Sequence, residues 1–274
     1  MSDVPTSAPP AFRPRLIDLN ADLGEGLPWD AAILPEITSA NLGCARHAGT
    51  PDDVRRTLEA IARQRDSHQP GATPTLRVGA HPGHPDPDHF GRRVLPITPQ
   101  GLRDLLLEQT HDLIAWAGEF GLTVAFLKPH GALYHQILDD PDLVDTALDV
   151  AHLLGLDLVG MPHTPLFERA TRRHPALRVV AEGFVDRRLT SQGRLWPRSQ
   201  PGAILTDPED IARQIEDLLT RGVETLCVHG DRPEAVELAR WTRQVIKRSG
   251  WQVGWPTPRQ TSDATPIPLP SPKA

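Results

Sequence analysis

The feature that most constrains this chain is a repeated pair of residues that opens helices. In each pair a Thr or Asp is followed by Pro, and apolar residues at helical spacing come after it. The Thr or Asp side chain caps the first backbone amides, and Pro fits the first helical position because the amide there has no partner. The sequence therefore predicts helices starting at Thr50-Pro51, Thr98-Pro99, Asp140-Pro141, Thr164-Pro165, Asp207-Pro208 and Asp231-Arg232-Pro233.

Short apolar runs of strand length lie between these helices. They cover residues 16–19, 37–42, 76–80, 123–127, 156–161, 178–181 and 225–228. Strands that alternate with helices indicate an α/β fold with a parallel sheet and right-handed crossovers. Seven strands favour a (β/α) barrel, and an open doubly wound sheet is the alternative, because strand count does not show whether a sheet closes.

The two ends of the chain differ in composition from the body. Residues 1–14 and 257–274 are rich in Pro and poor in apolar residues, so we expect disordered tails on either side of one catalytic domain spanning 15–256. Lys and Arg number 29 against 35 Asp and Glu, and the resulting net charge of −6 argues against a nucleic-acid partner. The sequence has neither an apolar run of membrane-spanning length nor a signal peptide, and two cysteines are too few for a disulfide scaffold, so we expect a cytoplasmic protein.

Chemically capable side chains gather directly after the predicted strands. Five of the twelve histidines do so: His47, His81, His84, His130 and His229. In parallel α/β folds the carboxyl ends of the strands carry the active site, so these segments are expected to meet at one mouth of the barrel.

Sequence motifs, present and absent, limit the reactions expected at the mouth of the barrel. The sequence has no phosphate-binding loop, no dinucleotide fingerprint and no nucleophile elbow. Asp22, His47 and His81 could together bind a divalent metal through a carboxylate and two imidazoles. Cys44 is expected to be a buried, unreactive thiol.

Lys128 stands out because the chain has only three lysines and this one directly follows a strand. It could supply a positive charge or a proton to a developing oxyanion, or form an ion pair inside the barrel mouth. The guanidinium groups of Arg92, Arg187 and Arg198 suit a carboxylate or phosphate, which predicts a small anionic substrate. Their neighbours Arg93 and Arg188 are expected to point away.

Seven segments, in this order, resemble signatures of the LamB/YcsF family. They are LNADLGE, SANLGCARHAG, GAHPGHPD with FGRR, LKPHGALY, EGFVDRR, RSQPGA and CVHGD, and they run from Ile17 to Asp231. The resemblance implies a barrel of the glycoside hydrolase/deacetylase type. It also implies the role of the A subunit of ATP-dependent 5-oxoprolinase, which converts 5-oxo-L-proline, ATP and water to L-glutamate, ADP and phosphate with partner subunits B and C.

The resemblance also marks site residues. We expect a catalytic group formed by Asp22, Glu25, His47, His81, Lys128 and His130. We expect substrate binding by Asn41, Arg92, Asp186, Arg187, Arg198, His229 and Asp231. ATP would be a co-substrate used mainly with the partners, and a divalent metal is possible.

The sequence departs from the family pattern at a few positions. Ala21 and Gly26 replace a usual Cys and Ser, Ala45-Arg46 replaces Gly-Phe, and residues 161–164 replace a small Gly/Ser-rich stretch. Arg46 would add a cation and His163 a base near the mouth. Three alternatives stay open: a stand-alone metal-dependent amidase or deacetylase, a non-catalytic ligand-binding subunit, and, because of six tryptophans, a carbohydrate-binding protein.

Overall fold

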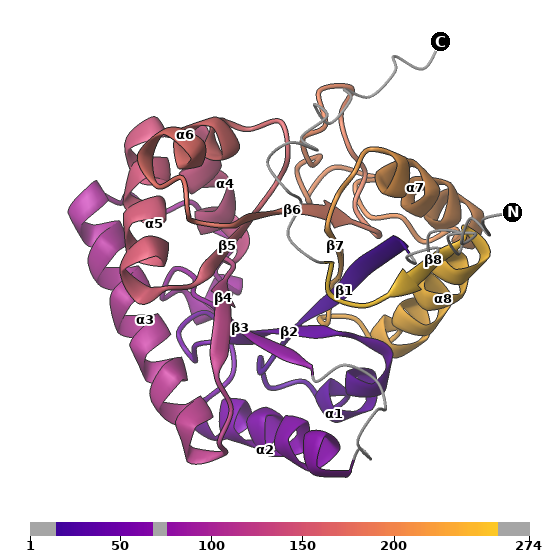
Figure 1. Cartoon of the computed structure of the whole chain (residues 1–274), viewed down its shortest axis with the longest axis horizontal. Coiled ribbons are helices and arrows are strands. Elements are labelled where there is room, and N and C mark those ends of the chain that lie inside the picture. Colours follow the sequence, from indigo (N-terminus) through magenta and orange to yellow (C-terminus); the bar gives the residue numbers. More distant parts are fainter. Residues whose placement is uncertain (1–14, 68–75, 257–274) are drawn as a thin grey trace, which may run out of the picture.

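The computed structural model describes residues 15–67 and 76–256, and in it the seven predicted strands form a closed parallel barrel (Figure 1). The predicted tails, 1–14 and 257–274, lie outside the described residues. The strands are β1 (Arg15–Leu23), β2 (Ser39–Gly43), β3 (Arg77–His81), β4 (Val124–Leu127), β5 (Asp157–Gly160), β6 (Val179–Phe184) and β7 (Thr225–Val228).

Closure of the barrel depends on β1, which pairs with the first and the last members of the series. Asn20 of β1 lies opposite Ser39 of β2 on one side and Cys227 of β7 on the other. The other neighbours pair in sequence order, from β2 with β3 to β6 with β7. The barrel is therefore confirmed and the open sheet is excluded.

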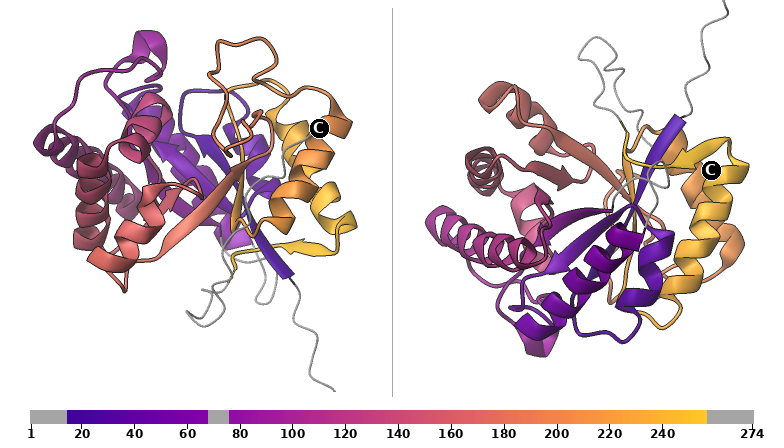
Figure 2. Two further views of the ribbon diagram at one scale, coloured as in Figure 1. Left: turned by 90° about the horizontal axis from the view of Figure 1, so that it is seen from above. Right: turned by 60° about the horizontal axis from the view of Figure 1, so that its bottom comes forward.

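Helices surround the barrel where the Pro pairs predict them (Figure 2). They are α2 (Pro51–Ser67), α3 (Pro99–Glu119), α5 (Pro141–Leu154), α6 (Pro165–Arg173), α7 (Pro208–Thr220) and α8 (Ala235–Arg248). Thr98, Asp140 and Asp207 accept hydrogen bonds from amides of the first turn, as caps do. Thr164 does not cap α6, since its hydroxyl donates to the carbonyl of Met161.

Several elements were not predicted. The short helices α1 (Asp30–Ile33), η1 (Leu34–Glu36) and η2 (Pro87–His89) follow β1 and β3, and α4 (Gly131–Asp139) begins directly after His130. The strand β8 (Trp251–Val253) pairs with the first residues of β1, outside the closed ring. No helix within 15–67 and 76–256 combines the length and hydropathy that a membrane crossing requires.

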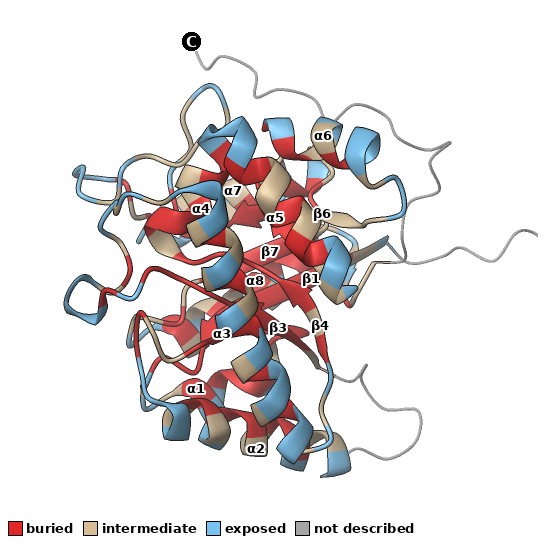
Figure 3. Cartoon of the chain, turned by 90° about the vertical axis from the view of Figure 1, so that its left-hand side faces the viewer, coloured by how far each residue is buried: buried red, intermediate tan, exposed pale blue. Residues whose placement is uncertain are grey.

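The sequence of β1 alternates between the two faces of the barrel wall. Ile17, Leu19 and Ala21 join the apolar layer between strands and helices, and they are fully buried. The residues between them are polar and bind residues of other strands across the interior. The barrel interior is therefore polar on the way to its mouth, while the outer layer forms the apolar core. Figure 3 shows that the strands are buried and that exposed residues lie on the outer sides of the helices.

Apolar packing and a stacked cation also involve the C-terminal part of the described chain. Trp255 packs against Phe126, Val159 and Val180, and the guanidinium of Arg77 lies 3.6 Å from the centroid of its ring. Trp255 therefore packs against buried apolar residues, and this arrangement gives no support to a carbohydrate platform.

Candidate active site

A cavity of about 1100 Å³ opens at the carboxyl ends of the strands. Eight of the thirteen predicted site residues line it: Asp22, His81, Arg92, Lys128, His130, Arg187, Arg198 and His229. The other five do not line it but bind or stack on residues that do: Glu25, Asn41, His47, Asp186 and Asp231. The structure thus gathers segments that lie more than two hundred positions apart in the sequence.

A column of polar side chains from β1 connects the barrel interior with the cavity. Asp18 accepts hydrogen bonds from hydroxyl groups of β2 and β7 and of the residue before β2, and burial raises its pKa. Above it, the amide of Asn20 donates to Thr225 over 2.6 Å. Asn41 donates to Asn20 and to Oδ1 of Asp22, so it fixes the Asp22 carboxylate from below.

Lys128 is a buried cation between two carboxylates. Its Nζ lies 2.8 Å from Oδ1 of Asp22 and 2.8 Å from Oε1 of Glu182, with the Cys227 sulfur 3.1 Å away. Burial by itself would lower the pKa of Lys128, but Asp22 first, then Cys227 and Glu182, hold that pKa well above its usual range. The ion pair inside the mouth is therefore the interpretation that the geometry supports, and Glu182 joins the site although it was not predicted.

The charge state of Asp22 follows from the same contacts. Burial would raise the pKa of this carboxyl, but Lys128 and then His81 outweigh burial and hold it well below its usual range. Oδ2 of Asp22 lies 3.5 Å from Nε2 of His81. Asp22 is therefore an ionised carboxylate whose second oxygen faces an imidazole.

His81 and His130 face each other with nitrogen atoms that both carry a lone pair. Nδ1 of His81 lies 2.7 Å from the carbonyl oxygen of Lys128, and Nε2 of His130 lies 2.9 Å from that of Phe90. A carbonyl only accepts, so each of these nitrogens must donate. The remaining nitrogens, Nε2 of His81 and Nδ1 of His130, lie 2.9 Å apart. Burial, followed by His47 and His81, holds the pKa of His130 well below its usual range.

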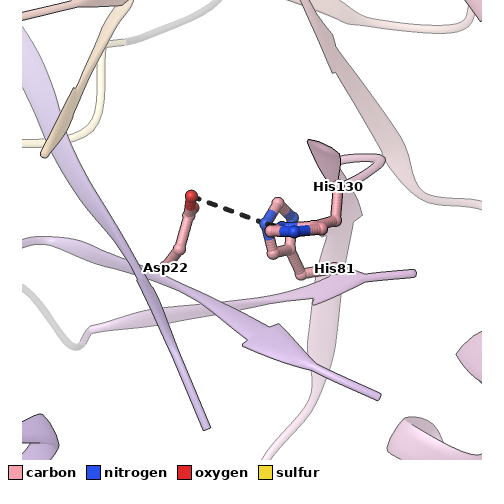
Figure 4. A group of neighbouring side chains, drawn as sticks. All are labelled: Asp22, His81 and His130. Carbon is pink, nitrogen blue, oxygen red and sulfur yellow. Dashed lines mark hydrogen bonds and ion pairs between the residues drawn. The ribbon is translucent and has the colours of Figure 1, made fainter. Parts of the chain in front are cut away.

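This geometry fits a divalent metal. Asp22, His81 and His130 offer a carboxylate oxygen and two imidazole nitrogens within 4.8 Å of one another (Figure 4). Backbone carbonyls fix both imidazole tautomers, as is usual for histidines that ligate metals. The structure therefore brings His130, rather than the expected His47, together with Asp22 and His81.

Glu25 and His47 lie behind His130. His47 is fully buried, its ring stacks on His130 with 3.8 Å between centroids, and its Nε2 lies 3.1 Å from Oε1 of Glu25. Gly83 allows this packing, since a Cβ there would lie 2.9 Å from Nδ1 of His47. The two residues therefore support the orientation of His130, and together the three form a second group of possible metal ligands.

His229 forms a dyad with a buried carboxylate. Nδ1 of His229 lies 2.8 Å from Oδ1 of Asp186, which is 1% exposed, and the ring stacks on Phe184. In the described part of the chain, Nε2 of His229 has no hydrogen-bond partner, and the side chain lines the cavity. An imidazole oriented by a carboxylate is suited to proton transfer. Asp22, Cys227 and His229 also form a third possible ligand group.

Three arginines lie on the same rim of the cavity. Arg92 and Arg198 both donate to Oδ2 of Asp231, the latter over 2.8 Å. Arg187 is 6% exposed and has no carboxylate at ion-pair distance among residues 15–67 and 76–256; its one side-chain hydrogen bond goes to the carbonyl of Trp196. Burial and then Arg198 lower its pKa. A buried cation without a carboxylate at ion-pair distance indicates a place for an anion.

The departures from the family pattern lie away from this cavity. The guanidinium of Arg46 binds Glu108 and Asp112 of α3, and neither Arg46 nor His163 lines the cavity, so neither adds a charge or a base to the cavity lining. Arg93 binds Asp86, as expected of a residue that points away. Cys44 is fully buried, and burial raises the pKa of its thiol to about 12.

Fold and site define a (β/α)-barrel protein with an imidazole- and carboxylate-lined cavity at the carboxyl ends of its strands. The LamB/YcsF family matches residues 17–261, and the chain belongs to this family. It is 40% identical over 255 residues to the A subunit of 5-oxoprolinase from Nocardia farcinica, covering 85% of this chain and 96% of the relative. The A subunit from Thermus thermophilus is 38% identical over 260 residues, covering 86% and 98%.

A solved structure shares the fold. The crystal structure of a lactam utilization protein from Thermus thermophilus superposes with a TM-score of 0.74 at 35% sequence identity. The match covers 87% of this chain and 98% of the other.

Proposed function

We propose that this chain opens the ring of 5-oxo-L-proline as the A subunit of an ATP-dependent 5-oxoprolinase, together with subunits B and C. One observation carries the proposal: a carboxylate–imidazole cluster suited to activating water shares a cavity with a buried, unpaired Arg187 suited to a substrate carboxylate. The relatives support the same substrate class, since they are named as A subunits of 5-oxoprolinase and as a lactam utilization protein.

The chemistry explains a need for ATP. Amide resonance stabilises a five-membered lactam, and opening the unstrained ring is not favourable enough alone. Transfer of the γ-phosphoryl group of ATP to the lactam oxygen, with loss of the N–H proton and departure of ADP, activates the ring carbon. Because the sequence has no phosphate-binding loop, we assign this transfer to the partner subunits.

Hydrolysis then consumes two water molecules. The first adds to the ring carbon, and the C–N bond breaks as the nitrogen takes up a proton, which leaves an acyl phosphate. The second cleaves the acyl phosphate to L-glutamate and inorganic phosphate.

We assign the activation of water to Asp22, His81 and His130. Asp22 is ionised and fixed by Lys128 and Asn41, so it can orient a water molecule. Without a metal, a neutral His130, whose pKa is held low, can accept a proton from that water through Nδ1. A divalent metal held by the same three residues would instead take up this lone pair, lower the pKa of a bound water and polarise the substrate.

The remaining residues bind the substrate carboxylate and protonate the leaving nitrogen. Arg187 would hold the substrate carboxylate through a bidentate pair. His229, oriented by Asp186, would deliver the proton to the leaving nitrogen. Lys128 would act as a fixed counter-ion rather than as a donor to the substrate, since its ammonium already contacts two carboxylates and a thiol.

The test is an assay of glutamate release from 5-oxoproline by this chain, with and without ATP and with and without subunits B and C. We expect release only when ATP and both partners are present. Release without ATP that chelation abolishes would instead identify a stand-alone metal-dependent amidase. Full release by the partners alone would identify a non-catalytic subunit.

A further inference from the structure

We infer that Arg92 and Arg198, bridged by Asp231, form a phosphoryl-binding clamp at the mouth of the cavity. Its ligand would be the phosphoryl group of an O-phosphorylated lactam. This inference rests on the proposed function and adds to it: the chain receives its substrate after a phosphoryl-transfer reaction has taken place elsewhere. We call Arg92, Arg198 and Asp231 the arginine clamp.

The arginine clamp brings together three loops. Arg92 follows β3, Arg198 lies between β6 and α7, and Asp231 follows β7. Both guanidinium groups donate from Nη2 to one and the same oxygen, Oδ2 of Asp231. A guanidinium carries five N–H donors, so most donors of both groups remain for a ligand. Both side chains line the cavity and keep 32% and 26% of their surface exposed.

The guanidinium groups at this rim offer more hydrogen-bond donors than a lactam carboxylate can accept. Burial, then Arg198 and Arg92, lower the pKa of Arg187, while Asp186 and Asp231 raise it, so all three cations lie close together. Within the described residues, Asp231 is the carboxylate to which Arg92 and Arg198 donate, and both use its Oδ2. A substrate carboxylate bound by Arg187 occupies the fork of one guanidinium and leaves the other donors of Arg92 and Arg198 available. A phosphoryl group offers three further oxygens, which arginine forks bind best.

The position of Arg92 fits a phosphoryl group on the reacting end of the lactam. Its guanidinium lies 4.6 Å from the ring centroid of Phe90, whose carbonyl fixes His130. A Cβ at Gly131, the next residue after His130, would lie 3.6 Å from Cγ of Arg92. A phosphoryl group held there keeps the ring carbon beside the His81–His130 pair. The volume of about 1100 Å³ leaves room for this group, since a drug-sized ligand typically fills about 300–1,000 Å³.

Separate binding of two probes tests the inference. Inorganic phosphate reports on the arginine clamp and 5-oxoproline reports on Arg187, each measured by calorimetry on the full chain. We expect Arg92→Gln and Arg198→Gln to weaken phosphate binding roughly tenfold and to leave 5-oxoproline binding within about twofold, since a charge-assisted hydrogen bond contributes about that factor. Arg187→Gln should do the reverse. Arg63→Gln, on an exposed face of α2, is the matched control.

Asp231 gives the sharpest readout. It competes with a phosphoryl group for the two guanidinium groups, so Asp231→Asn should tighten phosphate binding severalfold, whereas a residue with a purely structural role would weaken it. Arg92→Lys, which keeps the charge, should retain part of the affinity if Arg92→Gln folds poorly.

The contrary outcomes are distinct. Phosphate affinity unchanged in both Arg92→Gln and Arg198→Gln, or lost only in Arg187→Gln, overturns the clamp. Failure of 5-oxoproline to bind while phosphate binding still depends on Arg92 and Arg198 overturns the proposed substrate and leaves the clamp in place.

Discussion

The ammonium of Lys128 and the carboxylate of Asp22 form an ion pair inside the barrel, with 2.8 Å between Nζ and Oδ1. Their side chains are only 2% and 7% exposed, and Glu182 lies equally close to the same ammonium. Two carboxylates thus share one built-in cation. This arrangement fixes Asp22 as an anion at the base of the cavity, and the chemistry of the site depends on it.

Removal of the Lys128 ammonium should destabilise the folded chain and inactivate it. Lys128→Met leaves Asp22 and Glu182 as buried, uncompensated charges, so the free energy of unfolding should fall by about 3–5 kcal/mol. Adding Glu182→Gln to that variant should restore part of the loss. Urea unfolding measures both. A loss below about 1 kcal/mol in Lys128→Met would mean that the pair contributes little.

The His81–His130 pair predicts metal binding. Two facing lone pairs 2.9 Å apart need a proton or a cation between them. Calorimetric titration with Zn²⁺ or Mn²⁺ should give one site, and His130→Ala should weaken it at least tenfold. His47→Ala, behind the ligand, should cost about 10–100-fold through loss of orientation. His152→Ala, on the outer helix α5, is the control. Equal affinity in wild type and His130→Ala would contradict the assignment.

The His229–Asp186 dyad predicts a selective loss of turnover. His229→Ala should lower kcat of the reconstituted enzyme by about 10²–10⁴, the usual contribution of a positioned proton donor. Asp186→Asn keeps the imidazole but not its orientation, so its loss should be smaller, and the pH profile of kcat should shift. If His229→Ala left both kcat and its pH profile unchanged, His229 would have no role in proton transfer.

Asp30 predicts a pH dependence of stability. Its carboxylate accepts from the amide of Gly24 and the hydroxyl of Thr57, yet burial raises its pKa to about 6. A raised carboxyl pKa means that the folded state holds the proton more tightly, so its contribution to stability is full below about pH 4 and is lost as pH rises through about 6. The shift corresponds to about 3 kcal/mol. Urea unfolding between pH 4 and 8 measures the fall in the free energy of unfolding as pH rises. In Asp30→Asn the part of this fall that comes from Asp30 should be absent. A fall as large as in wild type would contradict the prediction.

Local signals made most of the fold predictable. A Thr or Asp followed by Pro marks the start of α2, α3, α5, α6 and α7, because both residues act within one turn, although the Thr164 side chain does not cap α6. The helix-start signal is missing from α4, which begins at Gly131 with no side-chain cap. The strand β8 is only three residues long, too short for a recognisable apolar pattern. Closure of the barrel rests on pairing between β1 and β7, which no local pattern encodes.

The sequence predicted which residues belong to the site, but not which of them line the cavity and which lie behind it. Residues that follow parallel strands converge at one rim, so eight of the thirteen line the cavity. Which residue touches the cavity depends on packing across the barrel: His47 stacks behind His130, and Asp231 is bound between two arginines. Glu182 gave one signal, because it directly follows the predicted strand 178–181, but its partner Lys128 follows another strand, β4.

The most direct test of the central claim is the initial rate of glutamate formation from 5-oxoproline by His130→Ala, in the presence of ATP and subunits B and C. We expect a rate at least about 10² below wild type, with an unfolding midpoint close to that of wild type. Glutamate formation at the wild-type rate would contradict it, because the lactam would then be opened without the imidazole pair at the mouth of this barrel.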